Sequence, residues 1–178
     1  MKFSRSTLLA GTAALTAGLV DAALSSSDSC SFSTTITAAA GVSLLNACPT
    51  LAGTITVQGD GAGPIELNSV EEIKGDLTFT NSSTTTTINL NQLKSISGSL
   101  SIEAYTQLFT IDFTNLQNVS SLSLISLPSL ATLNLNTGLS KVSLLEVSDT
   151  ALDDLSGLLG AFNTIDYLNV NNNKNVTH

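Results

Sequence analysis

The feature that most constrains the fold of this chain is an apolar pattern that recurs every 22 or 23 residues. Four columns of aliphatic or aromatic residues follow this period through five or six consecutive repeats. They are Ile55, Leu77, Leu100, Leu122, Leu145 and Leu168; Val57, Phe79, Ile102, Leu124, Val147 and Val170; Val70, Leu93, Leu116, Leu139 and Phe162; and Ile73, Ile96, Val119, Val142 and Ile165. A fixed period of this size is typical of stacked units, each of which buries its apolar face against the next.

Within one repeat the local pattern has a period of two. Leu77-Thr78-Phe79 and Ile88-Asn89-Leu90 alternate apolar and polar residues, which predicts two short strands per repeat. The columns of Val70 and Ile73 are spaced i and i+3 and predict a bend or short helical turn on a third side. Because every repeat winds the same way, the strands must stack in parallel. We expect a mainly β protein, a right-handed parallel β-solenoid of about 23 residues per turn or a leucine-rich-repeat-like L domain.

Glycine and asparagine mark the expected corners of each repeat. Gly53, Gly75 and Gly98 each lie just before a predicted strand, where glycine allows a tight corner. Asn68, Asn91 and Asn136 follow the second strand, where a side-chain amide can satisfy the backbone groups of a turn. The plain leucine-rich pattern L-x-x-L-x-L-x-x-N is not followed, so a helix-backed horseshoe is disfavoured.

Residues 1–22 are typical of a secretory signal peptide. Lys2 and Arg5 precede an apolar run from Leu8 to Val20, and Val20-Asp21-Ala22 resembles a cleavage site. The alternative is a membrane anchor, but the run is shorter than the ~20 residues that span a bilayer. No other stretch is long and apolar enough, so no transmembrane span is expected.

Two cysteines follow the predicted cleavage site. Cys30 and Cys48 enclose a short loop, and in an oxidising compartment such a pair usually forms a disulfide. A loop of this size stabilises by ~3 kcal/mol in the chain-entropy model. The alternative is two free thiols. The single histidine, His178, argues against a zinc site, and no metal or cofactor is expected.

A different pattern separates the cysteines. Ala38, Val42, Leu45 and Ala47 favour a short amphipathic helix with Thr37 as its N-cap. We expect this helix to cap the open end of the core. The predicted organisation is therefore a signal peptide over 1–22, an N-terminal cap over 23–52 and solenoid repeats over 53–178.

The charge of the chain excludes some classes of ligand. Six basic and fourteen acidic residues give a formal net charge of −8. This balance provides no basic surface for nucleic acid or anionic lipid. Ser, Thr and Asn carry most of the polarity instead, which suits an extracellular glycoprotein.

Three N-glycosylation sequons begin at Asn81, Asn118 and Asn175. Asn81 precedes a polar run, Ser82 to Thr87, that is either a loop able to carry O-linked sugar or a solvated insertion. Asn118 lies between apolar positions but can point outward, and Asn175 lies close to the last residue of the sequence.

Outward strand positions form two polar columns. One column takes one residue from the first strand of each repeat: Thr56, Thr78, Ser101, Ser123, Glu146 and Asn169. The other takes one residue from the second strand: Glu66, Asn89, Asp112 and Asn134. The second column alternates acids with amides, which keeps like charges apart. It provides either solubility alone or a flat face that binds a glycan or a partner protein. The absence of tryptophan and the isolation of Tyr105 and Tyr167 argue against tight sugar binding.

The sequence contains no recognisable catalytic residues. Asp149, Asp153 and Asp154 are the nearest to an acid pair, which some β-helix enzymes use to cut polysaccharides. Adjacent Asp153 and Asp154 should diverge, and no nucleophile with a partner base accompanies them. We therefore expect a protein that is not an enzyme.

Several segments of the sequence resemble a known family. The order Cys30, helix, Asn46-Ala47-Cys48 and Leu51 to Val57 resembles the start of a receptor L domain. The repeated I-x-G-x-L-x-I unit, the segment Leu124–Leu158 and Tyr167–Lys174 are similar to fungal GPI-anchored cell-wall organisation and sporulation-specific wall proteins. The resemblance implies a role in fungal cell-wall organisation and integrity, at the wall or the outer face of the plasma membrane. The GPI signal and Ser-rich stalk of the family are not present in this sequence.

The C-terminal end of the sequence has no polar cap. Leu168-Asn169-Val170 predicts a clean strand, and the sequence ends in mid-repeat at His178. Solenoids need a capped end for solubility. We therefore expect a longer natural domain, and self-association of this chain through the uncapped strand edge.

Overall fold

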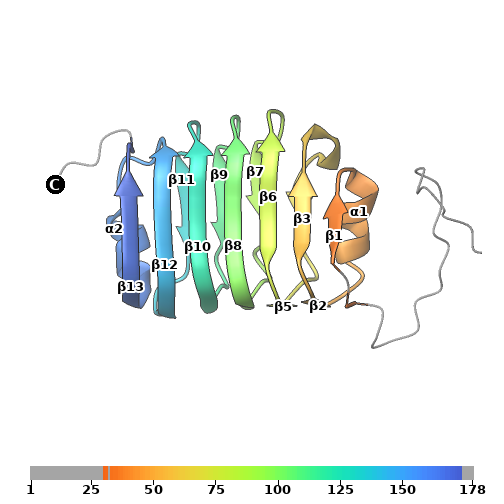
Figure 1. Ribbon diagram of the computed structural model, residues 1–178, viewed down its shortest axis with the longest axis horizontal. Helices are drawn as coiled ribbons and strands as arrows, with labels where there is room; N and C mark the ends of the chain where they lie inside the picture. The colour runs from red at the N-terminus through yellow and green to blue at the C-terminus, as the bar shows by residue number, and fades with distance from the viewer. Residues whose placement is uncertain (1–29, 32, 174–178) are drawn as a thin grey trace, which may run out of the picture.

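Successive repeats pair strand by strand in a computed structural model that describes residues 30, 31 and 33–173 (Figure 1). The larger sheet has nine strands: β1 (Thr34–Ile36), β2 (Thr50–Ala52), β3 (Ile55–Gln58), β5 (Glu72–Lys74), β6 (Leu77–Ser82), β8 (Ser95–Tyr105), β10 (Asn118–Leu127), β12 (Leu139–Thr150) and β13 (Phe162–Asn171). The smaller sheet has four: β4 (Ile65–Glu66), β7 (Thr87–Asn89), β9 (Thr110–Phe113) and β11 (Thr132–Leu135). Every pairing between these strands is parallel. The protein is therefore mainly β, with two parallel sheets.

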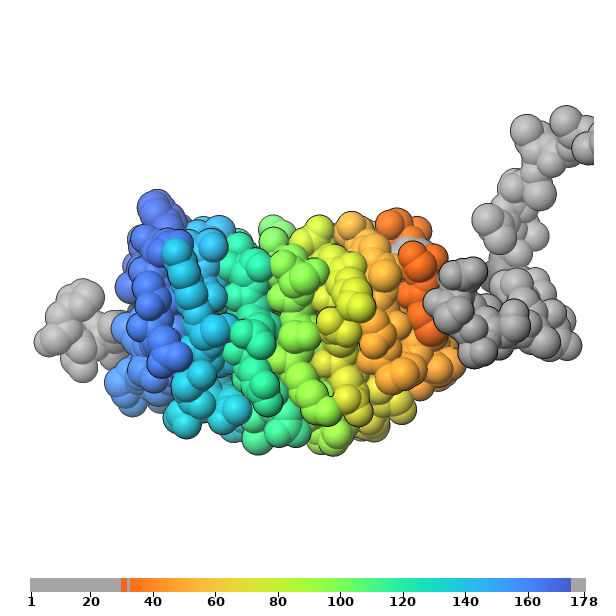
Figure 2. All heavy atoms as spheres, turned by 90° about the horizontal axis from the view of Figure 1, so that it is seen from below, coloured from red at the N-terminus to blue at the C-terminus, as the bar shows by residue number. Residues whose placement is uncertain are grey.

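The register of both sheets follows the sequence period. In the larger sheet the order is β1-β3-β6-β8-β10-β12-β13, and Leu77 pairs with Ile55 on one side and Leu100 on the other. The same column continues through Leu122, Leu145 and Leu168. In the smaller sheet the order is β4-β7-β9-β11. The repeats of β3, β6, β8 and β10 thus each add one strand to both sheets, whereas after β12 a helix over 156–161 takes the place of the second strand. The repeats are the rungs of one stack and follow one another along the long axis of the molecule (Figures 1 and 2).

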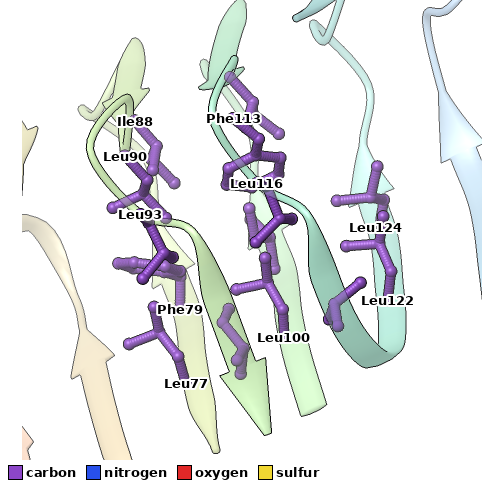
Figure 3. Packing of buried hydrophobic residues seen from close by; sticks show 14 of the residues in the cluster. Leu77, Phe79, Ile88, Leu90, Leu93, Leu100, Phe113, Leu116, Leu122 and Leu124 are labelled. Carbon is purple, nitrogen blue, oxygen red and sulfur yellow. The ribbon is translucent and has the colours of Figure 1, made fainter. Parts of the chain in front are cut away.

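The core lies between the two sheets. Leu77 and Phe79 point inward from β6, and Ile88 and Leu90 approach them from β7 and the residue after it (Figure 3). These four side chains are fully buried. Burying a side chain of this size contributes about 1.5–3 kcal/mol, and the columns repeat that contribution in every rung. A one-residue shift in the pairing register of a strand is not tolerated, because it would turn the buried side chains of that strand to solvent.

The prediction of a bend or helical turn at the Ile73 column is wrong. Ile73 lies in β5 and pairs with Ile96, which lies in β8 together with Leu100 and Ile102. The larger sheet therefore includes this column, and each repeat presents two sheets joined by corners. The spacing of i and i+3 misled the prediction because Val70 lies in the connection before β5, whereas Ile73 lies within the strand.

Three short helices complete the fold: α1 (Ala39–Leu45), the 3₁₀ turn η1 (Asp60–Ala62) and α2 (Ser156–Ala161). Helix α1 lies beside β1 at one end of the stack (Figure 1) and buries Val42 and Leu45. The predicted N-cap is wrong: the cap residue is Ala38, and no side chain caps the helix. Burial of the apolar side chains, rather than a cap, therefore supports α1.

Cys30 and Cys48 form the predicted disulfide, with Cα atoms 5.9 Å apart. The bond joins the chain ahead of β1 to the segment that follows α1. The carbonyl of Cys30 also accepts the backbone N–H of Ala52 at 2.9 Å. The disulfide thus holds α1 against the first rung of the larger sheet.

Candidate functional site

The predicted binding face follows the smaller sheet. Glu66 pairs with Asn89, Asn89 with Asp112 and Asp112 with Asn134, in consecutive registered positions. We call these four residues the short-sheet column. Their side chains are exposed or half-buried. The structure therefore brings the four predicted residues together, with acids and amides in alternation.

Hydrogen bonds to the following turns engage several of these side chains. Asn89 Oδ1 accepts the backbone N–H of Asn91 at 3.1 Å, and Asp112 Oδ1 accepts that of Thr114 at 3.0 Å. Glu66 Oε2 accepts the Asn68 amide at 3.5 Å. The strand residue, rather than the asparagine after it, thus satisfies the turn backbone at Asn91. This column consequently serves the turns that close each repeat.

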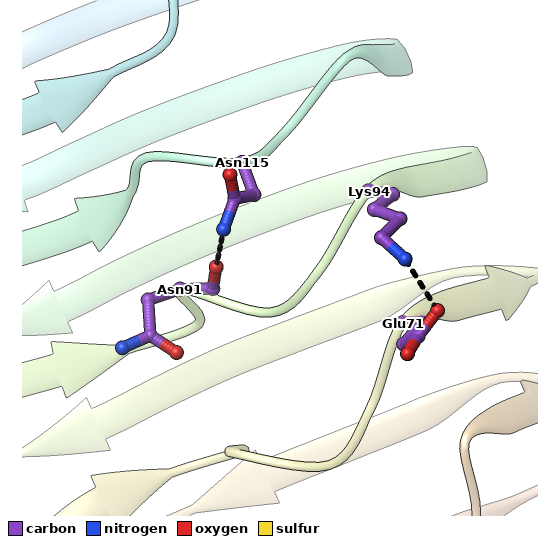
Figure 4. Close-up of polar contacts among 4 residues, drawn as sticks. All are labelled: Glu71, Asn91, Lys94 and Asn115. Carbon is purple, nitrogen blue, oxygen red and sulfur yellow. Dashed lines mark hydrogen bonds and ion pairs between the residues drawn. The ribbon is translucent and has the colours of Figure 1, made fainter.

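Polar contacts also connect successive corners. Asn115 Nδ2 donates to the Asn91 carbonyl at 2.5 Å, and Lys94 Nζ lies 2.6 Å from Glu71 Oε2 (Figure 4). Each contact joins residues one repeat apart. Since Lys94 and Glu71 are about half exposed, their ion pair contributes no more than about 1 kcal/mol.

A second polar column crosses the outer face of the larger sheet. Its registered members are Thr56, Thr78, Ser101, Ser123, Glu146 and Asn169. Toward β13 the small hydroxyls give way to longer side chains that contact one another. Asn169 Nδ2 donates to Glu146 Oε1 at 2.8 Å, and Ser123 Oγ donates to Glu146 Oε2 at 3.5 Å. Asn171 Nδ2 donates in turn to Asn169 Oδ1.

The two tyrosines occupy opposite environments. Tyr167 lies in β13 on the outer face and is 62% exposed. Tyr105 is fully buried at the end of β8, and its hydroxyl has no hydrogen-bond partner among the described residues. Burial, with a smaller contribution from the negative charge of Asp60, raises the pKa of Tyr105 to about 12. Tyr105 is therefore neutral at physiological pH and belongs to the core, whereas Tyr167 is available to solvent.

In β3, β6, β8, β10, β12 and β13, a residue with a positive φ angle lies next to the last residue of the strand. Besides Gly59 (φ 80°), the positions are Asn81 (58°), Ala104 (56°), Ser126 (55°), Asp149 (54°) and Asn172 (51°). We call these six residues the left-handed column. Sequence reasoning missed it, although the residue types carry a signal, since Gly, Asn and Asp are the residues that adopt this conformation most readily.

The first sequon lies on this column. Asn81 is exposed, and the following Ser82 and Ser83 both contact Asp60 in the previous repeat. Asp60 Oδ1 accepts the backbone N–H of Ser83 at 2.6 Å, and Oδ2 accepts its hydroxyl at 2.9 Å. The backbone and side-chain donors of Ser83 lower the pKa of Asp60 below its usual value. Ser82 and Thr85 are buried whereas the other residues of the polar run are exposed, so the run is a corner that is anchored to the core at two positions.

The second sequon begins on an exposed side chain as well. Asn118 opens β10, and its Oδ1 accepts the Ser140 hydroxyl of the next repeat. The third sequon, at Asn175, lies outside the described residues. So does the predicted signal peptide at 1–22.

Two of the three aspartates considered as catalytic candidates, Asp149 and Asp154, take part in local hydrogen bonds. Asp154 accepts the backbone N–H and the hydroxyl of Ser156, each at 2.7 Å, and these donors lower its pKa. Asp149 accepts the amide of Asn172 from the next repeat. Asp153 and Asp154 border a hollow of about 450 Å³ between β11 and α2 that Leu133 and Leu158 also line. The arrangement thus resembles helix-start hydrogen bonding rather than a pair of carboxylates facing a substrate.

Residues 30, 31 and 33–173 contain no group of three His, Cys, Asp or Glu side chains placed to hold a metal ion. None of the helices described in this range is long and apolar enough to cross a membrane.

Comparisons with known proteins place the chain among fungal surface proteins. It is 52% identical over 156 residues to the cell surface GPI-anchored protein ECM33 of Candida albicans, covering 87% of this chain and 38% of the relative. It is 34% identical over 130 residues to the cell wall mannoprotein PST1 of Saccharomyces cerevisiae, covering 73% of this chain and 28% of the relative. With the cell wall protein ecm33 of Schizosaccharomyces pombe it shares 26% identity over 133 residues, 73% of this chain and 31% of the relative.

The chain thus spans well under half the length of these relatives. No family model and no solved structure matches it. The relatives nevertheless cover 73% to 87% of this chain. They belong to the family that the Cys30–Cys48 segment and the I-x-G-x-L-x-I units predict, so that prediction is confirmed. Over the region that it shares with them, the chain belongs to the family of fungal cell-surface and cell-wall proteins that includes ECM33, PST1 and the sporulation-specific protein 2.

Proposed function

We propose that this protein is a secreted, non-enzymatic component of the fungal cell surface that contributes to cell-wall organisation and integrity. The observation that carries the proposal is the 52% identity, over 87% of the chain, to a cell surface GPI-anchored protein. The local hydrogen bonding of Asp149 and Asp154 supports the non-enzymatic part of the proposal, because their carboxylates are engaged within the fold. Attachment to the wall or to the outer face of the plasma membrane follows from the same relatives.

The fold suits such a role. We infer that the two parallel sheets are the sides of a right-handed β-solenoid related to L domains, with residues 23–52 as its N-terminal cap and 53–178 as repeats. The parallel pairing of every rung supports this inference. A stack of this kind is stiff, since each rung contacts only its neighbours and buries the same columns. It presents two long outer faces to the wall.

We infer that Asn81 and Asn118 carry N-linked glycans. Both side chains are exposed and each begins a sequon, in a chain whose sequence opens with a predicted signal peptide. Glycosidase treatment of the secreted protein should lower its mass, and Asn81→Gln and Asn118→Gln should each remove one step. An unchanged mass would count against occupied sequons.

A deletion of the gene, complemented with the wild-type chain, tests the cell-wall role. We expect deleted cells to be sensitive to a wall-binding dye and the complemented cells to resist it. Normal growth and wall composition in the deleted strain, with no paralogue to compensate, would contradict the proposal.

A second candidate is recognition of a wall glycan or a partner protein through an outer face. The registered short-sheet column favours it, since four polar residues share one surface. Pull-down of wall material that is lost in a Glu66→Gln/Asp112→Asn variant would support this face. Equal pull-down by the variant and the wild type would exclude it.

A further inference from the structure

We propose that the outer face of β12 and β13 is a binding site for an uncharged polysaccharide, with Tyr167 as the stacking platform and Glu146, Asn169 and Ser123 as hydrogen-bonding groups. The inference rests on the cell-wall role proposed above and names the class of ligand. It places glycan binding on the larger sheet, away from the short-sheet column.

The geometry brings an aromatic ring and a polar cluster onto one flat surface. Tyr167 is registered against Leu144, and two residues further along the same strands Asn169 is registered against Glu146. Neighbouring strands lie ~4.8 Å apart, and residues i and i+2 of one strand lie about 6.6 Å apart. The ring and the polar cluster are therefore about one sugar unit apart, so a single chain of sugars can contact both.

The polar groups are held in place before any ligand arrives. Glu146 receives the Asn169 amide at 2.8 Å and the Ser123 hydroxyl at 3.5 Å, so side chains from three strands form one chain of hydrogen bonds. Asn171 extends the chain on β13 by donating to Asn169. Carboxylate and amide oxygens accept more than one hydrogen bond, so Glu146 and Asn169 keep capacity for sugar hydroxyls. Preorganisation of this kind lowers the entropic cost of binding.

The chemistry of the surface selects the ligand. A tyrosine that is 62% exposed offers a flat apolar face against which the C–H groups of a sugar ring can pack. A carboxylate and an amide oxygen accept hydrogen bonds from sugar hydroxyls. The neighbouring Lys141 is paired with Asp166 at 2.6 Å, which leaves a net negative surface unsuited to anionic polymers.

The same face is a poor match for a protein partner. Its apolar part is limited to Leu144, Tyr167 and the half-buried Ile125, and the flanking outward positions are Ser121, Ser123 and Ser148. A stable protein interface buries about 800 Å² on each side with an apolar centre, which three residues do not supply.

A purified chain of residues 1–178, expressed in a secretory host, provides the first test. We expect retarded migration in native gels that contain laminarin, a β-1,3-glucan, and binding of laminarihexaose or chitohexaose by titration calorimetry. Tyr167→Ala should weaken binding at least tenfold, and Glu146→Gln or Asn169→Ala severalfold. Phe109→Ala is the matched control, since Phe109 is 56% exposed but lies in the corner before β9, and it should bind like the wild type.

Tyrosine fluorescence allows ligand binding at this face to be measured directly. The chain has two tyrosines and no tryptophan, so a Tyr105→Phe variant reports fluorescence from Tyr167 alone. We expect iodide to quench this emission and laminarihexaose or chitohexaose to protect it. The two oligosaccharides distinguish a glucan from a chitin ligand.

The proposal is overturned if the folded wild-type chain binds neither oligosaccharide, if Tyr167→Ala binds as tightly as the wild type, or if Phe109→Ala loses as much affinity as Tyr167→Ala. Binding confined to cationic chitosan and abolished by salt would also overturn it. Circular dichroism of each variant verifies its fold. A negative result here does not contradict the cell-wall role, because the dye sensitivity of deleted cells tests that role without measuring glycan binding.

Discussion

At the residue scale, the left-handed column shows how one backbone conformation is imposed on six different positions. Gly59, Asn81, Asp149 and Asn172 are residue types that adopt positive φ at low cost, whereas Ala104 and Ser126 adopt it against their preference. The conformation persists at Ala104 because the rungs on both sides hold β8 in register. The packing between neighbouring repeats therefore offsets a backbone strain of about 1 kcal/mol or more at Ala104 and Ser126.

Replacing Ala104 by asparagine should relieve that strain. Asparagine occupies the same place in the preceding repeat, at Asn81, and tolerates positive φ. We expect Ala104→Asn to raise the free energy of unfolding by about 0.5–1 kcal/mol, measured by urea denaturation. Ala104→Val should instead lower it by more than 1 kcal/mol, because a β-branched residue disfavours this conformation. Equal stability of the two variants would contradict the interpretation.

The buried hydroxyl of Tyr105 permits a second test at this scale. A buried polar group without a hydrogen bond costs about 1–3 kcal/mol, and Phe has the same shape without that group. We expect Tyr105→Phe to leave the free energy of unfolding unchanged or raise it by about 1 kcal/mol. Tyr167→Phe, at an exposed position, should change it by less than about 0.5 kcal/mol. A clear loss of stability in Tyr105→Phe would mean that the hydroxyl is hydrogen-bonded in solution.

At the scale of elements, the corner between β5 and β6 depends on close backbone contact. Gly75 has a φ of 150°, and a Cβ atom there would lie 2.0 Å from the carbonyl oxygen of Gly53 in the previous repeat. The glycine therefore allows two corners to stack. In helix α2, by contrast, a Cβ atom at Gly157 would meet no atom within 4 Å.

These two glycines should respond to alanine in opposite directions. We expect Gly75→Ala to lower the free energy of unfolding by about 2–3 kcal/mol, because the corner must shift to admit the methyl group. Gly157→Ala should raise it by up to about 1 kcal/mol through better helix propensity. Chemical denaturation of both variants measures the difference, and a loss of similar size at both positions would contradict the role of the corner.

The disulfide stabilises the N-terminal elements. Cys30–Cys48 closes a loop with a sequence separation of 18, which corresponds to about 3 kcal/mol in the chain-entropy model. Reduction should therefore lower the urea midpoint and increase hydrogen exchange first in β1 and α1. The chain has two cysteines, so a reductant acts on this bond alone. An unchanged midpoint after verified reduction would show that packing of Val42 and Leu45 suffices.

For the whole molecule, the sequence predicts the arrangement of rungs but not the contacts between them. Columns such as Leu77, Leu100 and Leu122 were predictable because each strand buries one face, which requires the same spacing in every repeat. The short-sheet column followed from the same argument. The contacts of Asp60 with Ser83 and of Glu146 with Asn169 depend on side-chain conformations across repeats, and the spacing alone does not specify them.

The edge strand β13 leads to a prediction for residues 1–178. β13 pairs with β12 on one side, and among the described residues no strand pairs with its other edge. Leu168, in the inward column, is 46% exposed there. Because an open edge with an exposed apolar column favours pairing with a second chain, we propose that a chain of residues 1–178 self-associates through β13. Light scattering should show a mass that rises with concentration, and Leu168→Lys should suppress the rise. Leu44→Lys, at the α1 end and 57% exposed in the wild type, is the matched control and should not. A constant monomer mass for the wild type, or equal suppression by both variants, would exclude association through this edge.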